Sequence, residues 1–289
     1  MDEVAGEFVN DILNAFVATS ADAADAGRPL FVALAGVPGS GKSTLARMAA
    51  DMLNAQAEAA AAGGIGGSQV VGSMGSVKLP DEDDEDLGYK ATGPATDIRL
   101  GKCFVLGMDG YHMTRAELDA MGDPEEAHRR RGAHWTFDAN KLYKDLAQLK
   151  NTGQLSAPTF DHATRDPTPN AIDIDARTVT RPVYDDDLQP IGADVCRCIV
   201  IVEGLYLAMQ DLPSWERVNG LFDLVAFLQC DAGVAVERLV QRHMTAWGVP
   251  RDEALARASG SDAENAALVE TTAINAHVVF DSVPDDTVA

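Results

Sequence analysis

The residues best suited to chemistry in this sequence begin with a glycine-rich segment that ends in lysine and serine. Its pattern is G-x-x-x-x-G-K-[ST], and it stands between an apolar run and a helical segment, which is the context this motif requires. Glycines let a backbone wrap around phosphate oxygens with its N–H groups turned inward, and a helix that begins there adds its positive dipole end. Lys42 is expected to reach the β- and γ-phosphates of ATP, and Ser43 to ligate Mg²⁺. The predicted ATP-binding residues are Gly36, Val37, Pro38, Gly39, Ser40, Gly41, Lys42, Ser43 and Thr44.

Two acidic residues directly follow other apolar runs, where phosphoryl transfer could use a carboxylate. Asp109 follows residues 103–108, and Glu203 follows residues 198–202. We expect Asp109 to act as the general base beside an acceptor hydroxyl, and Glu203 to hold Mg²⁺ directly or through water. The two roles could be exchanged, and either acid could instead cap a helix.

The elements that must position these groups alternate between apolar strands and amphipathic helices. Buried strands are expected at residues 30–35, 103–108, 198–202, 221–229 and 277–280, and helices at 43–56, 139–150, 234–247, 251–258 and 262–273. This pattern predicts an α/β fold of the P-loop NTPase class: a parallel sheet with helices on both faces, lid helices and a small hairpin insertion. Because parallel strands end at one edge of a sheet, Lys42, Asp109 and Glu203 should converge there.

The domain organisation predicted from the sequence is a single P-loop kinase domain over residues 1–289. An amphipathic N-terminal helix is expected within residues 1–20. Residues 57–97 change to alanine and glycine and then to a run of acids, which predicts a flexible acidic insertion.

Composition excludes several classes of partner. The chain has 23 Lys and Arg against 45 Asp and Glu, a formal net charge of −22, which repels nucleic acid and anionic membranes. It lacks an apolar run of about 20 residues and a signal-like N-terminus, so a cytoplasmic protein is expected. The four cysteines lack the spacing of a zinc site. A small-molecule substrate is the expected partner; a homo-oligomer is compatible with the sequence but not indicated by it.

Five segments in a fixed order carry a resemblance to a known family: residues 36–44, 108–112, 130–138, 158–162 and 200–205. Together they resemble the uridine kinase, phosphoribulokinase and pantothenate kinase family of P-loop kinases, and most closely its fructokinase-like or nucleoside/sugar kinase branch, which includes fungal members. The resemblance implies that the acid after the second strand, Asp109, is the base. It also implies the substrate contacts Tyr111, His112, Arg131, Trp135, Asp138, His162 and Asn265.

The same resemblance implies a lid whose arginines close over the triphosphate. Arg238 and Arg242 are four residues apart and therefore share one face of a predicted helix. Guanidinium groups suit phosphate oxygens and the charge of the transition state, so both are predicted catalytic residues together with Asp109 and Lys42. A solvated helix face is the alternative.

These features predict an ATP-dependent kinase that transfers the γ-phosphate to a hydroxyl of a sugar, a nucleoside or a pantothenate-like acceptor. The alternatives are a P-loop NTP hydrolase and a non-catalytic nucleotide-binding regulator. A hydrolase needs an element that orients water, and a regulator would be expected to have lost the lysine or the carboxylates. The joint presence of cradle, base, metal ligand and lid arginines favours the kinase.

Overall fold

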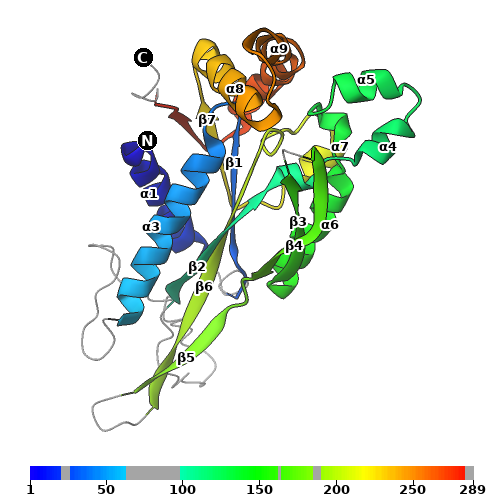
Figure 1. Cartoon of the computed structure of the whole chain (residues 1–289). Helices are drawn as coiled ribbons and strands as arrows, with labels where there is room; N and C mark the ends of the chain where they lie inside the picture. The colour runs from blue at the N-terminus through cyan, green and yellow to red at the C-terminus, as the bar shows by residue number, and fades with distance from the viewer. Residues whose placement is uncertain (21–26, 63–97, 162–163, 185–189, 284–289) are drawn as a thin grey trace.

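The computed structural model describes residues 1–20, 27–62, 98–161, 164–184 and 190–283, which are arranged around a central sheet (Figure 1). Its strands are β1 (Leu30–Gly36), β2 (Ile98–Gly107), β5 (Val179–Tyr184), β6 (Pro190–Gly204), β7 (Leu224–Gln229) and β8 (Val278–Asp281). The order is β2-β6-β1-β7-β8 with parallel pairings throughout, and β5 adds to β6 as an antiparallel strand. The predicted parallel α/β fold is confirmed.

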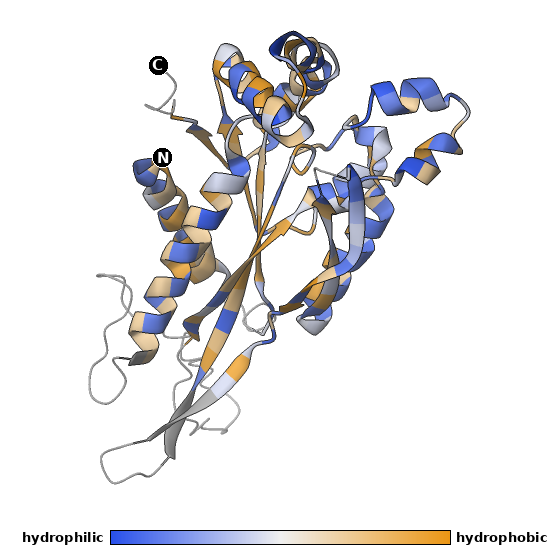
Figure 2. Cartoon of the chain, in the orientation of Figure 1, coloured by the Kyte–Doolittle hydropathy of each residue, from blue (hydrophilic) through white to orange (hydrophobic). Residues whose placement is uncertain are grey.

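Helices cover both faces of the sheet, as its apolar strands require. Alternate residues of β1 point to opposite faces, and every residue of this strand is buried. Phe31 and Ala33 belong to the core beneath α6 (Ala139–Thr152) and α7 (Pro213–Asn219). Leu30, Val32 and Leu34 belong to the core beneath α1 (Asp2–Ser20) and α3 (Lys42–Ala62). Figure 2 shows the resulting hydrophobic strands between mixed helices.

The sheet register brings the strand ends that carry the predicted chemistry side by side. Glu203 on β6 pairs with Leu34 on β1 and with Gly107 on β2. Asp109 follows in the 3-10 turn η1 (Met108–Tyr111), and the phosphate loop follows β1 directly. Backbone pairing therefore fixes the relative positions of these three segments.

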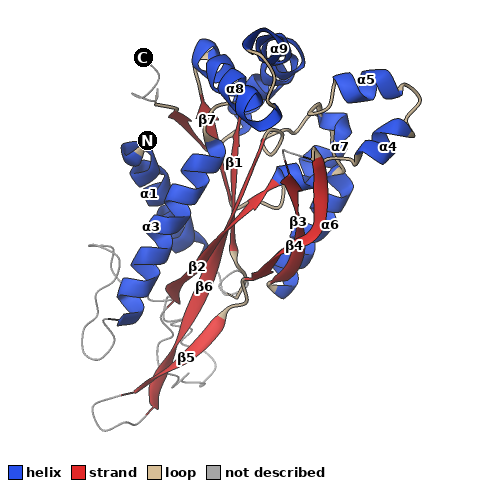
Figure 3. Cartoon of the chain, viewed as in Figure 1, coloured by secondary structure: helices blue, strands red, loops and turns tan. Residues whose placement is uncertain are grey.

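A second group of elements lies around that edge of the sheet (Figure 3). The hairpin β3 (Gln154–Asp161) and β4 (Asp166–Asp175) forms a separate antiparallel pair, which agrees with the predicted hairpin insertion. Two short helices, α4 (Arg115–Asp119) and α5 (Pro124–Arg129), follow η1; both are absent from the sequence prediction. The lid region contains α8 (Ala232–Trp247), α9 (Arg251–Arg257), a π-helical turn (Ala258–Asp262) and α10 (Ala263–Glu270). The 3-10 turns η2 (His134–Thr136) and η4 (Thr271–Asn275) complete the described elements.

Several predicted boundaries are wrong: the strand expected at residues 198–202 begins at Pro190, and the strand expected at 103–108 begins at Ile98. The helix expected to end at residue 56 continues to Ala62, so the first residues assigned to the acidic insertion are helical. The cause is the alanine-rich sequence after residue 56, because alanine is the strongest helix former. The rest of that insertion, residues 63–97, lies outside the described residues. Among the described helices, none combines the length and apolarity needed to cross a membrane.

Candidate active site

The phosphate loop connects β1 to α3 in a conformation that depends on its glycines. Gly39 has φ +81°, and a Cβ there would lie 2.4 Å from the carbonyl oxygen of Ala235 on α8. A side chain at this position would therefore be strained and would collide with the lid helix. Lys42 is the first residue of α3, at the positive end of the helix dipole. The loop has the geometry of an anion cradle covered by α8.

Lys42 is buried, and its ammonium group lies within the loop. Nζ donates to the carbonyl oxygen of Val37 at 2.8 Å and approaches Oγ of Ser40 at 3.5 Å. Burial lowers its pKa to about 8, while the negative charges of Glu203 and Asp109 partly oppose that shift. The charged form is thus costly in this position, and a phosphate group beside it would favour that form.

Ser43 near the start of α3 and Glu203 near the end of β6 bring two side-chain oxygens together. Ser43 Oγ donates to Glu203 Oε1 at 3.0 Å. Adjacent ligands of an octahedral ion with bonds of about 2.1 Å are separated by about 3 Å, so these two oxygens fit neighbouring positions around Mg²⁺. Burial and the nearby Asp109 charge raise the pKa of Glu203, whereas Lys42 and the Ser43 hydrogen bond oppose that rise. A hard cation would relieve the same cost.

Asp109 is held at the cavity by the turn that follows β2. Its side chain is 41% exposed, and within the described residues its carboxylate accepts no hydrogen bond. His112 Nδ1 lies 3.9 Å from the carboxylate and donates to the backbone oxygen of Asp109 at 2.8 Å. The ring of His112 is held beside Phe137, with a centroid separation of 3.9 Å. This arrangement leaves the Asp109 carboxylate positioned to accept a proton from a molecule in the cavity.

A large cavity of about 660 Å³ collects most of the predicted site residues, and this volume suits a small-molecule site. Those that line it are Pro38, Gly39, Gly41, Lys42, Ser43, Thr44, Asp109, His112, Arg131, Glu203, Arg238, Arg242 and Asn265. Gly36, Val37 and Ser40 are buried residues of the loop and do not line the cavity. Asn265 is 2% exposed, and its Oδ1 accepts a weak contact from Arg130 at 3.5 Å.

The structure does not bring every predicted substrate contact to this cavity. Tyr111 is buried in the core against α6, where Lys141 lies 5.3 Å from its ring centroid, because the η1 turn directs it away from Asp109. Trp135 is 37% exposed and outside the cavity. Asp138 caps α6 by accepting from the Lys141 amide at 2.8 Å. His162 lies outside the described residues.

The two lid arginines on α8 have different surroundings. Arg238 donates to Ser282 Oγ at 2.9 Å and to the Val283 carbonyl at 2.7 Å, and it approaches the Ser40 carbonyl at 3.3 Å. Arg242 is exposed and lines the cavity; within the described residues its guanidinium makes no hydrogen bond or ion pair. Arg238 therefore holds the loop and the end of β8 together, whereas Arg242 has its donors available for a bound anion.

Several residues around the cavity are absent from the sequence prediction. Phe160 lines it and stacks on His112 with a centroid separation of 4.6 Å. His243 is 3% exposed, and its Nε2 lies 2.8 Å from Asp262 Oδ2 in the π-helical turn. Arg115, His128 and Arg165 gather near Arg131. The consecutive arginines at 129–131 are the one signal of this group that is visible in the sequence.

Comparison with known proteins agrees with this geometry. A sequence profile of the Phosphoribulokinase / Uridine kinase family matches residues 106–289, more than half of the chain. The ATP-dependent kinase-like protein notR' of Aspergillus versicolor is 37% identical over 148 residues, which cover 50% of this chain and 74% of that protein. The ATP-dependent kinase YFH7 of Zygosaccharomyces rouxii is 29% identical over 196 residues, covering 57% of this chain and 47% of that protein.

A solved structure shares the fold. The crystal structure of YFH7 from Saccharomyces cerevisiae superposes with a TM-score of 0.64 at 21% sequence identity, covering 98% of this chain and 99% of that chain. At that level of identity, the superposition supports the fold alone. The family assignment rests on the sequence profile, which includes Asp109, Glu203 and both lid arginines, together with the phosphate loop that precedes it. The chain belongs to the phosphoribulokinase/uridine kinase family.

Proposed function

We propose that this chain is an ATP-dependent kinase that transfers the γ-phosphoryl group to a hydroxyl group of a small metabolite. The observation that carries the proposal is the meeting of three segments around one cavity: the phosphate loop with Lys42, the Ser43–Glu203 oxygen pair, and the Asp109 carboxylate. This arrangement supports a cradle, a metal-ligand pair and a base acting on one bound substrate pair. The kinase names of the relatives agree with this assignment.

In the proposed reaction, Asp109 accepts the proton of the acceptor hydroxyl as its oxygen attacks the γ-phosphorus. The bond to the oxygen between the β- and γ-phosphorus breaks, ADP leaves with that oxygen, and the proton passes from Asp109 to solvent. Lys42 and Arg242 stabilise the charge that develops on the phosphate oxygens. Closure of the lid over the cavity excludes water, which would otherwise compete as acceptor.

Ser43 and Glu203 are the residues that would hold Mg²⁺ with the nucleotide. When bound there, Mg²⁺ neutralises charge on the β- and γ-phosphate oxygens. Among the described residues no group of three or more histidine, cysteine or acidic side chains forms a metal cage. One carboxylate and one hydroxyl are consistent with Mg²⁺, which keeps several waters and takes its remaining ligands from phosphate.

The direct test is a screen of ATP consumption over sugars, nucleosides, sugar acids, sugar phosphates and pantothenate, with the product identified by its mass. We expect one acceptor class to gain the mass of a phosphoryl group in step with ADP release. ADP release with no phosphorylated product would instead support an NTP hydrolase, and ATP binding without turnover would support a regulator.

The Asp109→Asn variant tests the proposed base. It should bind ATP with unchanged affinity and lose phosphoryl transfer by about 10³-fold, since a positioned base contributes about 10²- to 10⁴-fold. Initial rates and nucleotide binding by fluorescence measure the two quantities. Asp138→Asn is the matched control, because asparagine caps a helix as well as aspartate does and Asp138 lies outside the cavity. Full activity in Asp109→Asn would remove this residue from the base role.

A further inference from the structure

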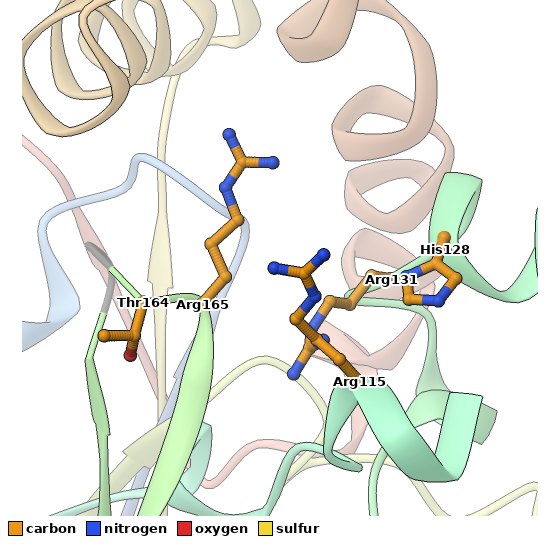
Figure 4. A pocket seen from close by; sticks show the side chains of 5 residues that line it. All are labelled: Arg115, His128, Arg131, Thr164 and Arg165. Carbon is orange, nitrogen blue, oxygen red and sulfur yellow. The ribbon is translucent and has the colours of Figure 1, made fainter. Parts of the chain in front are cut away.

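A second, smaller recess lies beside the large cavity, with a volume of about 220 Å³. The residues that line it, here called the arginine recess, are Arg115, His128, Arg131, Thr164 and Arg165. Three of them, His128, Arg131 and Arg165, also line the large cavity, so the two spaces adjoin. Figure 4 shows Arg165 reaching in from the hairpin on one side and Arg115 and Arg131 from the opposite side.

The arginines of this recess have more donors than the surrounding protein satisfies. Arg131 Nη2 donates to the Met113 carbonyl at 2.7 Å and to Asp166 Oδ1 at 3.2 Å. Its Nε and Nη1 are buried with no hydrogen-bond partner among the described residues. The guanidinium of Arg115 likewise makes no hydrogen bond or ion pair in the described part of the chain. Buried donors without acceptors are costly, so an anion that accepted from these N–H groups would remove that cost.

Like charges are gathered here in a chain whose net charge is −22. Burial lowers the pKa of Arg131, and the positive charges of Arg115 and Arg165 add to that shift, while Asp166 opposes it. Asp166 is shared, since it also accepts from the Arg115 backbone amide at 2.9 Å. His128 is paired with Asp119 at 2.7 Å. The guanidinium groups therefore repel one another, and a bound anion would remove that repulsion.

The tip of the hairpin holds Arg165 in a defined place. Its backbone has φ +59°, and its guanidinium lies 4.2 Å from the ring centroid of Trp247 at the end of α8. This cation–π contact fixes the plane of the guanidinium through its face. Its N–H edges make no hydrogen bond within the described residues and remain available to an acceptor.

The recess lies on the acceptor side of the large cavity. His112, which contacts Asp109, stacks on Phe160 with centroids 4.6 Å apart, and the Arg131 guanidinium lies 5.7 Å from the same Phe160 ring. Arg131 is thus linked to the proposed base through two intervening residues, Phe160 and His112. One small molecule could place a hydroxyl at Asp109 and a second group in the recess.

We infer that the arginine recess binds a phosphate monoester carried by the acceptor, at a distance from the hydroxyl that receives the γ-phosphoryl group. Three guanidinium groups match the charge and the several oxygens of a phosphate monoester, whereas a carboxylate occupies one guanidinium fork. The inference rests on the proposed kinase function and narrows its acceptor class to small hydroxylated phosphate esters.

The first experiment compares acceptors in matched pairs: ribose with ribose 5-phosphate, fructose with fructose 6-phosphate, and glycerol with glycerol 3-phosphate. For at least one pair, we expect kcat/KM for the phosphorylated member to exceed that for the neutral member by at least tenfold. Equal or better use of the neutral members, or exclusive use of carboxylate acceptors, would overturn the inference and leave the kinase proposal standing.

Two variants then locate the effect. Arg115→Gln removes an exposed charge at the first turn of α4, and Arg165→Asn places asparagine, which tolerates positive φ, at the hairpin tip. Each should raise KM for the phosphorylated acceptor by about 10- to 100-fold with a much smaller change in kcat, since a hydrogen bond between charged groups is lost. Arg165→Lys should restore part of the loss.

The matched control is Arg28→Gln, which makes the same change of charge before β1, at the opposite end of that strand from the phosphate loop. It should leave KM unchanged. An equal rise of KM in Arg28→Gln would show a general charge effect and overturn the assignment to the recess.

A binding measurement separates failure of this inference from failure of the kinase proposal. Inorganic phosphate is titrated calorimetrically into the protein while Mg²⁺ and a non-hydrolysable ATP analogue saturate the phosphate loop. Binding that weakens at least fivefold in Arg115→Gln and Arg165→Asn, and not in Arg28→Gln, supports the anion site even if no acceptor is phosphorylated. Absence of binding, or binding that is equal in all variants, overturns it.

Discussion

The two walls of the large cavity are built in different ways. One wall, here called the nucleotide wall, carries the phosphate loop, Glu203 and Asp109. It consists of adjacent strand ends whose positions are fixed by the register of β2, β6 and β1. The opposite wall, here called the acceptor wall, consists of short helices and a hairpin tip. These elements are distant in sequence and are held to one another by side-chain contacts. The Asp166–Arg131 ion pair and the bonds from Arg257 to the carbonyl oxygens of residues 129 and 131 are typical of it.

This difference separates the part of the site that acts on every acceptor from the part that distinguishes one acceptor from another. A strand end cannot shift without breaking backbone hydrogen bonds along a buried sheet, so the nucleotide wall is expected to be common to all reactions of this fold. Side-chain contacts can be exchanged one at a time at a cost of about 1 kcal/mol each. The acceptor wall is therefore where specificity is expected to be set.

The largest effect on kcat in a test of this division between the two walls is expected for an arginine of α8. Arg242→Gln should lower kcat by about 10- to 100-fold, and by the same factor for every acceptor, since a charge-assisted contact to the transferred group is lost. The melting temperature of the Arg242→Gln variant should stay unchanged. Arg238→Gln should instead destabilise the fold by about 1–3 kcal/mol, because Arg238 bridges the loop to Ser282 and Val283.

Steady-state kinetics and thermal melts of both variants check this pair. An Arg242→Gln effect that differed strongly between acceptors would place this arginine on the acceptor wall and break the division.

A second, smaller effect concerns pH. Because burial lowers the pKa of Lys42 to about 8, its charge is lost as the pH rises through that value. The dissociation constant for Mg-ATP should therefore rise about tenfold between pH 7 and pH 9, with proton uptake on binding above pH 8. Calorimetry in buffers of different ionisation enthalpy measures both.

Lys42→Arg provides the control, since arginine stays charged over this range. Binding by that variant should be weaker and independent of pH. If Lys42→Arg kept the same pH dependence as the original chain, another group would be responsible.

The smallest effects are expected at predicted contacts that lie outside the cavity. Tyr111→Phe and Trp135→Ala should each change kcat/KM by less than about twofold, since neither side chain lines the cavity. Steady-state kinetics with the identified acceptor gives the ratio. A tenfold loss in Trp135→Ala would show that the acceptor wall extends over η2.

The sequence predicts the nucleotide wall well because its signals are local. A continuous motif determines the loop, and each carboxylate directly follows a short apolar run of the kind that buried strands of a parallel sheet have. The rule that such strands end at one edge then brings Lys42, Asp109 and Glu203 together without knowledge of any other contact.

The acceptor wall could not be predicted in the same way. Arg115 and Arg165 are 50 positions apart, and their proximity depends on how the hairpin packs against η1 and α4. The direction of the η1 turn also decides whether Tyr111 or His112 faces the cavity, and a 3-10 turn gives no periodic pattern from which that direction can be read. Resemblance to a family supplies a set of residues here, but not their orientation.

The anchoring of Arg238 has a consequence for how the lid moves. Arg238 in the first half of α8 bonds to the phosphate loop and to Ser282, whereas farther along the helix His243 is bonded to Asp262 and the Arg165 guanidinium lies over Trp247. One helix therefore joins the phosphate loop, the π-helical turn and the arginine recess. A displacement of α8 would accordingly reach both ends of the cleft together, so that filling the recess would also change how the helix covers the phosphate loop.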